Sequence, residues 1–152
     1  MTAQTQFTED LATLYERDYH QWLLETTRLL KNKEFALLDL ENLIEEIASL
    51  GKSEKRAITS NLIVVMLHLL KWRYQPHKRS NSWKSSIREH RRRIQRLITD
   101  SPSLKNYLSQ MQADCYLAAK KQASDETGLS LLVFPEESPF SFAECLDEDF
   151  LA

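Results

Sequence analysis

Glycine is nearly absent from this chain of 152 residues, which has only Gly51 and Gly128, and proline occurs four times. A phosphate-binding P-loop and a dinucleotide-binding loop each need several glycines in one short turn, so neither can be built here. The scarcity of turn-forming residues also leaves little material for β-hairpins. The composition therefore favours helices.

Cysteine is equally scarce. The two cysteines, Cys115 and Cys145, lie far apart and form no paired motif. This excludes a paired-cysteine zinc site and a disulfide framework, and it indicates a reducing cytoplasm. The sequence has no HExxH, no GxSxG, and no histidine preceded by glutamate at the third position before it. No catalytic motif is found, so enzymatic activity is left open, and no cofactor or metal is predicted.

Long apolar runs are missing as well. The longest, residues 62–70, is interrupted by His68 and falls far short of the ~20 residues that a membrane span needs. Residues 1–6 contain no lysine or arginine and no long apolar segment follows them, so no signal peptide is expected. With 42% hydrophobic and 28% charged residues, we expect one domain, residues 1–152, located in the cytoplasm and not on a membrane.

Apolar residues recur at helical spacing in four segments. The first is expected to begin at Thr8–Asp10 and to end near Lys31 or Lys33. The second covers about 39–75, because its apolar stripe stays in phase through Gly51. A split into two helices at that glycine is the alternative.

The last two helices have recognisable starts. Ser82 is expected to cap the third, and Ser101-Pro102 to begin the fourth, which reaches about Glu126 with Gly128 at its C′ position. The prediction is an all-α fold: a helical bundle of four main helices, the second one long. An acidic C-terminal tail, 129–152, docks on it.

Charge is unevenly distributed. From Lys71 to Arg96 there are ten lysines and arginines against one acid, Glu89, a net charge of +9, which leaves −11 on the rest of a chain of net charge −2. The candidate basic patch consists of Arg73, Lys78, Arg79, Lys84, Arg88, Arg91, Arg92, Arg93 and Arg96. Trp72 and Trp83, which interleave with it, are in phase with the apolar stripes and are expected in the core.

Several arginines of the patch repel one another. Like charges four residues apart destabilise a helix, and this spacing holds for Arg88, Arg92 and Arg96. Within the helix, the attraction between Glu89 and Arg93 offsets part of the repulsion. The charge is thus expected to meet acids. Three sources stay open: the chain's own acids at 41–46 or 147–149, an acidic protein partner or second subunit, and nucleic acid. The pI near 6.1 disfavours nucleic acid, which usually selects basic domains.

A second candidate group is polar and consists of Glu41, Asn42, Glu45, Glu46, His68 and His90. Acids and imidazoles inside a bundle can bind a metal or transfer a proton. The plainer interpretation is that the histidines are hydrogen-bonded in the core and the acids are solvated near a helix start.

Six segments together resemble one known family: LYERDYHQWL (14–23), LDLENLIEEIASLGKSEKR (38–56), HLLKWRYQP (68–76), RSNSWKSSIREHRRRI (79–94), DSPSL (100–104) and FPEESPFSFAECLDEDFLA (134–152). This is the bacterial, largely cyanobacterial family named domain of unknown function 29. The resemblance covers nearly the whole chain and implies an all-α fold in a small bacterial protein. It implies no activity, so there are no catalytic residues to transfer. His90 and Ser138 depart from the family pattern, which has glutamine and often cysteine there.

Three functions follow as hypotheses. The first is a small cytoplasmic protein-interaction module that uses its basic helix and acidic tail to bind a protein partner or a second copy. The second is a metal-binding or hydrolytic bundle with a polar site near His68 and Glu45. The third is nucleic-acid binding through residues 84–96.

Overall fold

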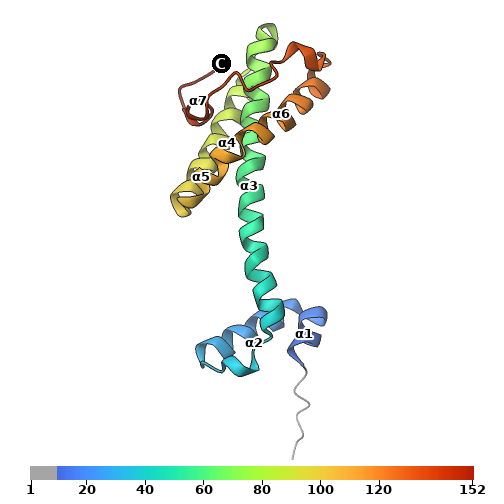
Figure 1. Ribbon diagram of the computed structural model, residues 1–152, viewed down its shortest axis with the longest axis vertical. Coiled ribbons are helices and arrows are strands. Elements are labelled where there is room, and N and C mark those ends of the chain that lie inside the picture. The colour runs from blue at the N-terminus through green and yellow to red at the C-terminus, as the bar shows by residue number, and fades with distance from the viewer. Residues whose placement is uncertain (1–9) are drawn as a thin grey trace, which may run out of the picture. The chain divides into compact units, whose positions relative to one another are not determined.

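The computed structural model describes residues 10–152, and the predicted helix start at Thr8 and Glu9 lies outside this range. No strand occurs between residues 10 and 152, which confirms the all-α prediction (Figure 1). The helices are α1 (Leu11–Arg17), α2 (Tyr19–Lys31), α3 (Leu40–Tyr74), α4 (Asn81–Asp100), α5 (Ser103–Gln110), α6 (Gln112–Thr127) and α7 (Phe142–Leu146). Short 3-10 turns are η1 (Phe35–Leu37), η2 (Pro76–Lys78) and η3 (Leu131–Val133).

The chain divides into two compact units, Met1–Gly51 and Lys52–Ala152, here called the N-terminal and C-terminal units. The N-terminal unit contains α1, α2 and the start of α3. The C-terminal unit contains the rest of α3 and all later elements. The grouping of both units into a single domain stays a prediction.

The long second helix is continuous. α3 has 35 residues and passes through Gly51 without a break, so the alternative of two helices is wrong. A glycine inside a helix costs about 1 kcal/mol relative to alanine, and the apolar stripe on both sides of Gly51 outweighs this cost. The helix ends at Tyr74 because Gln75, which precedes Pro76, has left the helical region with φ −131°.

Two of the four predicted helical segments are each interrupted once. Asp18, with φ −146°, separates α1 from α2, and its carboxylate accepts a hydrogen bond of 3.0 Å from the backbone N–H of Gln21. Met111 separates α5 from α6. Gly128 has φ +73° and ends α6 in the left-handed conformation, as its predicted C′ position requires.

The core of the C-terminal unit is built around the second half of α3. Ile58, Leu62 and Val65 are fully buried there, together with Ile94 of α4 and Ala119 of α6. The tail contributes to the same core, since the side chains of Phe134, Phe140 and Cys145 are also buried. This confirms the docked tail.

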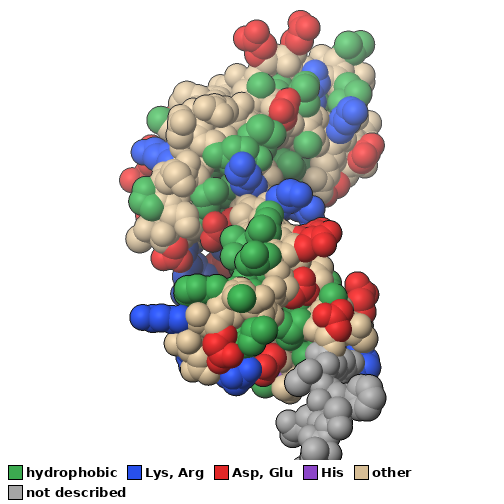
Figure 2. All heavy atoms as spheres, turned by 60° about the horizontal axis from the view of Figure 1, so that its bottom comes forward, with side chains coloured by type: hydrophobic (Ala, Val, Ile, Leu, Met, Phe, Trp, Pro, Cys, Tyr) green, Lys and Arg blue, Asp and Glu red, His purple; other side chains and the backbone are tan. Residues whose placement is uncertain are grey.

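The N-terminal unit is small and is organised around Trp22, which is fully buried. The rings of Tyr15 and Tyr19 pack on Trp22, with centroids 5.0 and 6.0 Å from its ring. Much of the unit's apolar surface is nevertheless exposed, and Figure 2 shows several hydrophobic side chains side by side on it.

Candidate functional site

One side of α4 presents cations to solvent. The helix begins at Asn81 because the Ser80 hydroxyl accepts a hydrogen bond from the Trp83 N–H at 3.2 Å, so Ser80 is the cap and the prediction of Ser82 is wrong. Ile87, Ile94 and Ile98 face the core. The exposed cations, here called the cationic side of α4, are Lys84, Arg88, Arg92, Arg93 and Arg96.

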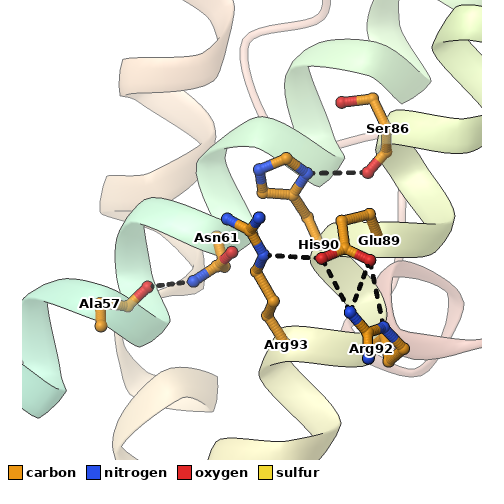
Figure 3. Close-up of polar contacts among 7 residues, drawn as sticks. All are labelled: Ala57, Asn61, Ser86, Glu89, His90, Arg92 and Arg93. Atoms are coloured by element: carbon orange, nitrogen blue, oxygen red, sulfur yellow. Dashed lines mark hydrogen bonds and ion pairs between the residues drawn. The ribbon is translucent and has the colours of Figure 1, made fainter.

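A single carboxylate serves two of these arginines. Glu89 lies 2.9 Å from Arg92 Nη2 and 3.0 Å from Arg93 Nε, and Figure 3 shows it between the two guanidinium groups. These hydrogen bonds lower the pKa of Glu89. Within residues 10–152, the side chains of Lys84, Arg88 and Arg96 form no ion pair or hydrogen bond. The predicted Glu89–Arg93 pair is therefore present, and most of the helix charge is not neutralised by the described part of the chain.

Arg91 has a different role from its neighbours. It is 3% exposed, and its guanidinium donates to the carbonyls of Cys145 at 2.8 Å, Phe150 at 2.7 Å and Glu144 at 3.0 Å. The last carbonyls of a helix have no partner within it, and here Arg91 supplies one for α7. Burial lowers the pKa of Arg91. It fixes the tail and does not belong to the cationic side of α4.

A signal for this role was present in the sequence. Ile87, Arg91, Ile94 and Ile98 follow one another at spacings of four, three and four residues, which places Arg91 on the buried face. A count of basic residues ignores helical phase and therefore does not separate Arg91 from the exposed arginines.

Of the three patch cations that precede α4, two pack on aromatic rings. The Arg73 guanidinium lies 5.0 Å from the centre of the Phe140 ring. Arg79 lies 5.0 Å over the Trp72 ring and donates to the Trp72 carbonyl at 2.8 Å. Lys78 is exposed in η2. Arg73 and Arg79 thus cover aromatic rings, contacts that contribute to the fold.

Both predicted core tryptophans are half-buried. Arg79 covers the Trp72 ring, and Lys71 Nζ lies 4.8 Å from the centre of the Trp83 ring. Lys71 also forms an ion pair of 2.9 Å with Glu126, which lowers the pKa of that carboxyl. No local sequence pattern links Lys71 to Glu126, because they are 55 positions apart in the chain.

The two histidines of the polar group are occupied by local backbone contacts. His68 Nδ1 lies 2.9 Å from the carbonyl of Val64, and His90 Nδ1 lies 2.8 Å from that of Ser86 (Figure 3 for His90). A carbonyl can only accept, so in each ring this nitrogen carries the proton. Burial lowers the pKa of His68. Among residues 10–152, no group of three or more histidines, cysteines or acids is placed to hold a metal ion.

The acids of the polar group lie in the N-terminal unit, whereas the histidines lie in the C-terminal unit. Glu46 accepts hydrogen bonds from the hydroxyls of Tyr15 at 2.5 Å and Tyr19 at 2.6 Å. The bond to Glu46 raises the pKa of Tyr15 to about 12. Neither tyrosine was predicted to contact an acid.

The other three polar residues of this region differ in surroundings. Asn42 donates to the Asp39 carboxylate at 2.7 Å, and the Trp22 indole N–H donates to the same carboxylate at 3.3 Å. Glu41 and Glu45 are exposed. Glu46 and Asp39 thus connect the start of α3 to α1 and α2.

The fold and these surfaces define an all-α protein with a charged helix and an anchored tail. Among residues 10–152, no helix is both long and apolar enough to cross a membrane. The family model described as "Domain of unknown function DUF29" matches residues 14–151, so the chain belongs to this family. No curated protein and no solved structure gives a significant match.

Proposed function

We propose that this protein is a protein-interaction module that binds an acidic protein surface through the cationic side of α4. The observation that carries the proposal is the set of five exposed cations on this helix. Between the first of them and the last, Glu89 is the one acid. Guanidinium groups bind carboxylates with two parallel hydrogen bonds, which gives such a surface geometric selectivity.

The cost of this arrangement supports the proposal. Like charges four residues apart destabilise a helix by a few tenths of a kcal/mol per pair, and Arg88, Arg92 and Arg96 form two such pairs. An acidic partner would convert this repulsion into attraction. The exposed tail acids Glu136, Glu137, Asp147, Glu148 and Asp149 give the module a second charged surface of opposite sign.

The competing functions have less support. A pI of 6.1 and the exposed tail acids oppose binding to nucleic acid, which favours domains of uniform positive potential. For a metal-binding site, no group of three or more histidines, cysteines or acids among residues 10–152 is placed to hold an ion. Free thiols at Cys115 and Cys145 fit a cytoplasmic setting.

A matched pair of charge-reversal variants tests the proposal. Arg88→Glu/Arg96→Glu removes two unpaired cations from the surface, whereas Lys31→Glu/Lys121→Glu makes the same change in net charge at exposed positions elsewhere. Each tagged protein is used for affinity purification from the native host, with and without nuclease, and bound proteins are identified by mass spectrometry.

The expected result is a protein partner that wild type and the lysine variant capture and the arginine variant loses. Its binding should weaken as salt rises, because exposed charges are screened, and should survive nuclease. Capture by all three proteins, capture of nothing, or loss of capture on nuclease treatment would each refute the proposal.

A further inference from the structure

Five of the exposed apolar residues of the N-terminal unit form a strip that begins just before α3 and continues on it. They are Leu37, Leu40, Ile44, Ile47 and Leu50, here called the apolar strip, with exposed fractions of 55–68%. The four on α3 are spaced by four, three and three residues, so they lie within about one third of the helix circumference. Equivalent positions of α3 in the C-terminal unit, such as Ile58 and Leu62, are fully buried.

The size of the strip matches what an interface needs. A fully exposed leucine or isoleucine side chain presents on the order of 100 Å², so the five residues expose roughly 300 Å² and two copies roughly 600 Å². An interface of about 1,000 Å², near the lower limit for specific complexes, has a similar apolar area. An exposed apolar patch of this extent is often functional.

We propose that the apolar strip pairs with the same strip of a second copy of this chain, with the two α3 helices antiparallel. A homodimer interface is self-complementary about a two-fold axis. In this arrangement Ile47 of each copy lies near the axis, and Leu40 lies beyond Leu50 of the other copy. The surface is separate from the cationic side of α4, so this inference goes beyond the proposed function.

Charges beside the strip select the antiparallel direction. Glu41, Glu45, Lys52 and Lys55 follow at spacings of four, seven and three residues, so they line one side of α3 next to the strip. Antiparallel helices place Glu45 opposite Lys52 of the other copy and Glu41 opposite Lys55. In parallel helices related by a two-fold axis, these charged sides would lie on opposite sides of the interface, so the pairs between Glu and Lys would not form.

Lys52 is the better probe of this pairing. Lys55 already lies 4.8 Å over the ring of Tyr107, so its replacement would also disturb the C-terminal unit. Glu45 and Lys52 are both exposed, and exchanging their charges leaves the monomer intact.

Sedimentation equilibrium of the full chain tests the dimer. Wild type should show a monomer–dimer equilibrium, and Ile47→Glu should raise the dissociation constant by about a hundredfold or more, because each dimer then buries two carboxylates at its centre. Leu132→Glu is the matched control, since Leu132 is 94% exposed in the tail, and it should dimerise like wild type. Circular dichroism should show the same helix content in all three.

The charge pair tests the direction. Glu45→Lys and Lys52→Glu should each weaken the dimer about threefold to tenfold, and the double variant should restore it. Arg88→Glu/Arg96→Glu should leave it unchanged, which separates this result from the proposed function. A monomeric wild type, as expected if another protein covers the strip, overturns the proposal, as does an Ile47→Glu protein that still dimerises. Failure of the double variant to recover overturns the antiparallel arrangement.

Discussion

Replacing Arg91 by methionine removes the guanidinium that binds three carbonyls of the tail. Methionine fills a similar apolar volume, so the change removes hydrogen bonds without opening a large cavity. The carbonyl of Cys145 then lies buried without its partner. Glu144 and Phe150 are half-buried residues, so water can approach their carbonyls.

Two effects of opposite sign set the magnitude. Removing the buried charge recovers part of its desolvation cost, whereas each lost hydrogen bond to a charged donor costs about 1.5–3 kcal/mol. Three such bonds outweigh the recovered solvation, so we expect a loss of about 3 kcal/mol in the free energy of unfolding. A domain of this size has about 5–15 kcal/mol in total, so the effect is large.

Urea unfolding followed by circular dichroism measures this loss, and limited proteolysis reports release of residues 141–152. Arg92→Met is the control, because Arg92 is exposed and its bond to Glu89 is worth less than about 1 kcal/mol. Equal stabilities for the Arg91 and Arg92 variants, or a tail equally resistant to protease in both, would refute the role assigned to Arg91.

Four further predictions concern other parts of the fold. Gly51→Ala should raise the free energy of unfolding by about 0.5–1 kcal/mol in thermal or urea unfolding, since a Cβ there meets no atom within 4 Å; a decrease would show that α3 needs the glycine. Glu46→Gln should lower the pKa of Tyr15 from about 12 toward 10 in an ultraviolet titration, and an unchanged titration would contradict the contact. The pKa of Glu46 is lowered in the folded state, so its contribution to stability is present above the unfolded pKa and is lost as the pH falls through the folded one, as chemical denaturation at several pH values would show. Burial raises the pKa of Cys115 to about 11 and of Cys145 to about 12, so both thiols should react with a thiol reagent only after unfolding exposes them; fast labelling of the native protein would contradict their burial.

Helical periodicity was sufficient to predict α3 and the third helix. It could not place the interruption at Asp18, because an aspartate can either continue a helix or cap the next one, and the choice depends on tertiary packing of Trp22. The apolar phase on both sides of Gly51 was a better guide to α3 than the glycine itself.

The candidate sites were harder to predict than the fold. Composition identified a basic segment, but which cations are exposed depends on helical phase and on contacts far along the chain. Arg91 meets residues 53 to 59 positions away, and Lys71 meets Glu126. Likewise, the acids near Glu46 were assigned to solvent, whereas two tyrosine hydroxyls bind Glu46. Such pairings are set by tertiary structure and leave no local signal.

The buried tail also has a consequence for synthesis on the ribosome. Helices α3 to α6 emerge before Phe140 and Cys145, which are part of the same core. Until those residues appear, the carbonyls that Arg91 binds are absent, and burying its charge without them would be unfavourable. The nascent C-terminal unit must therefore wait with its core open to water or to a chaperone, and it closes only after α7 has been translated.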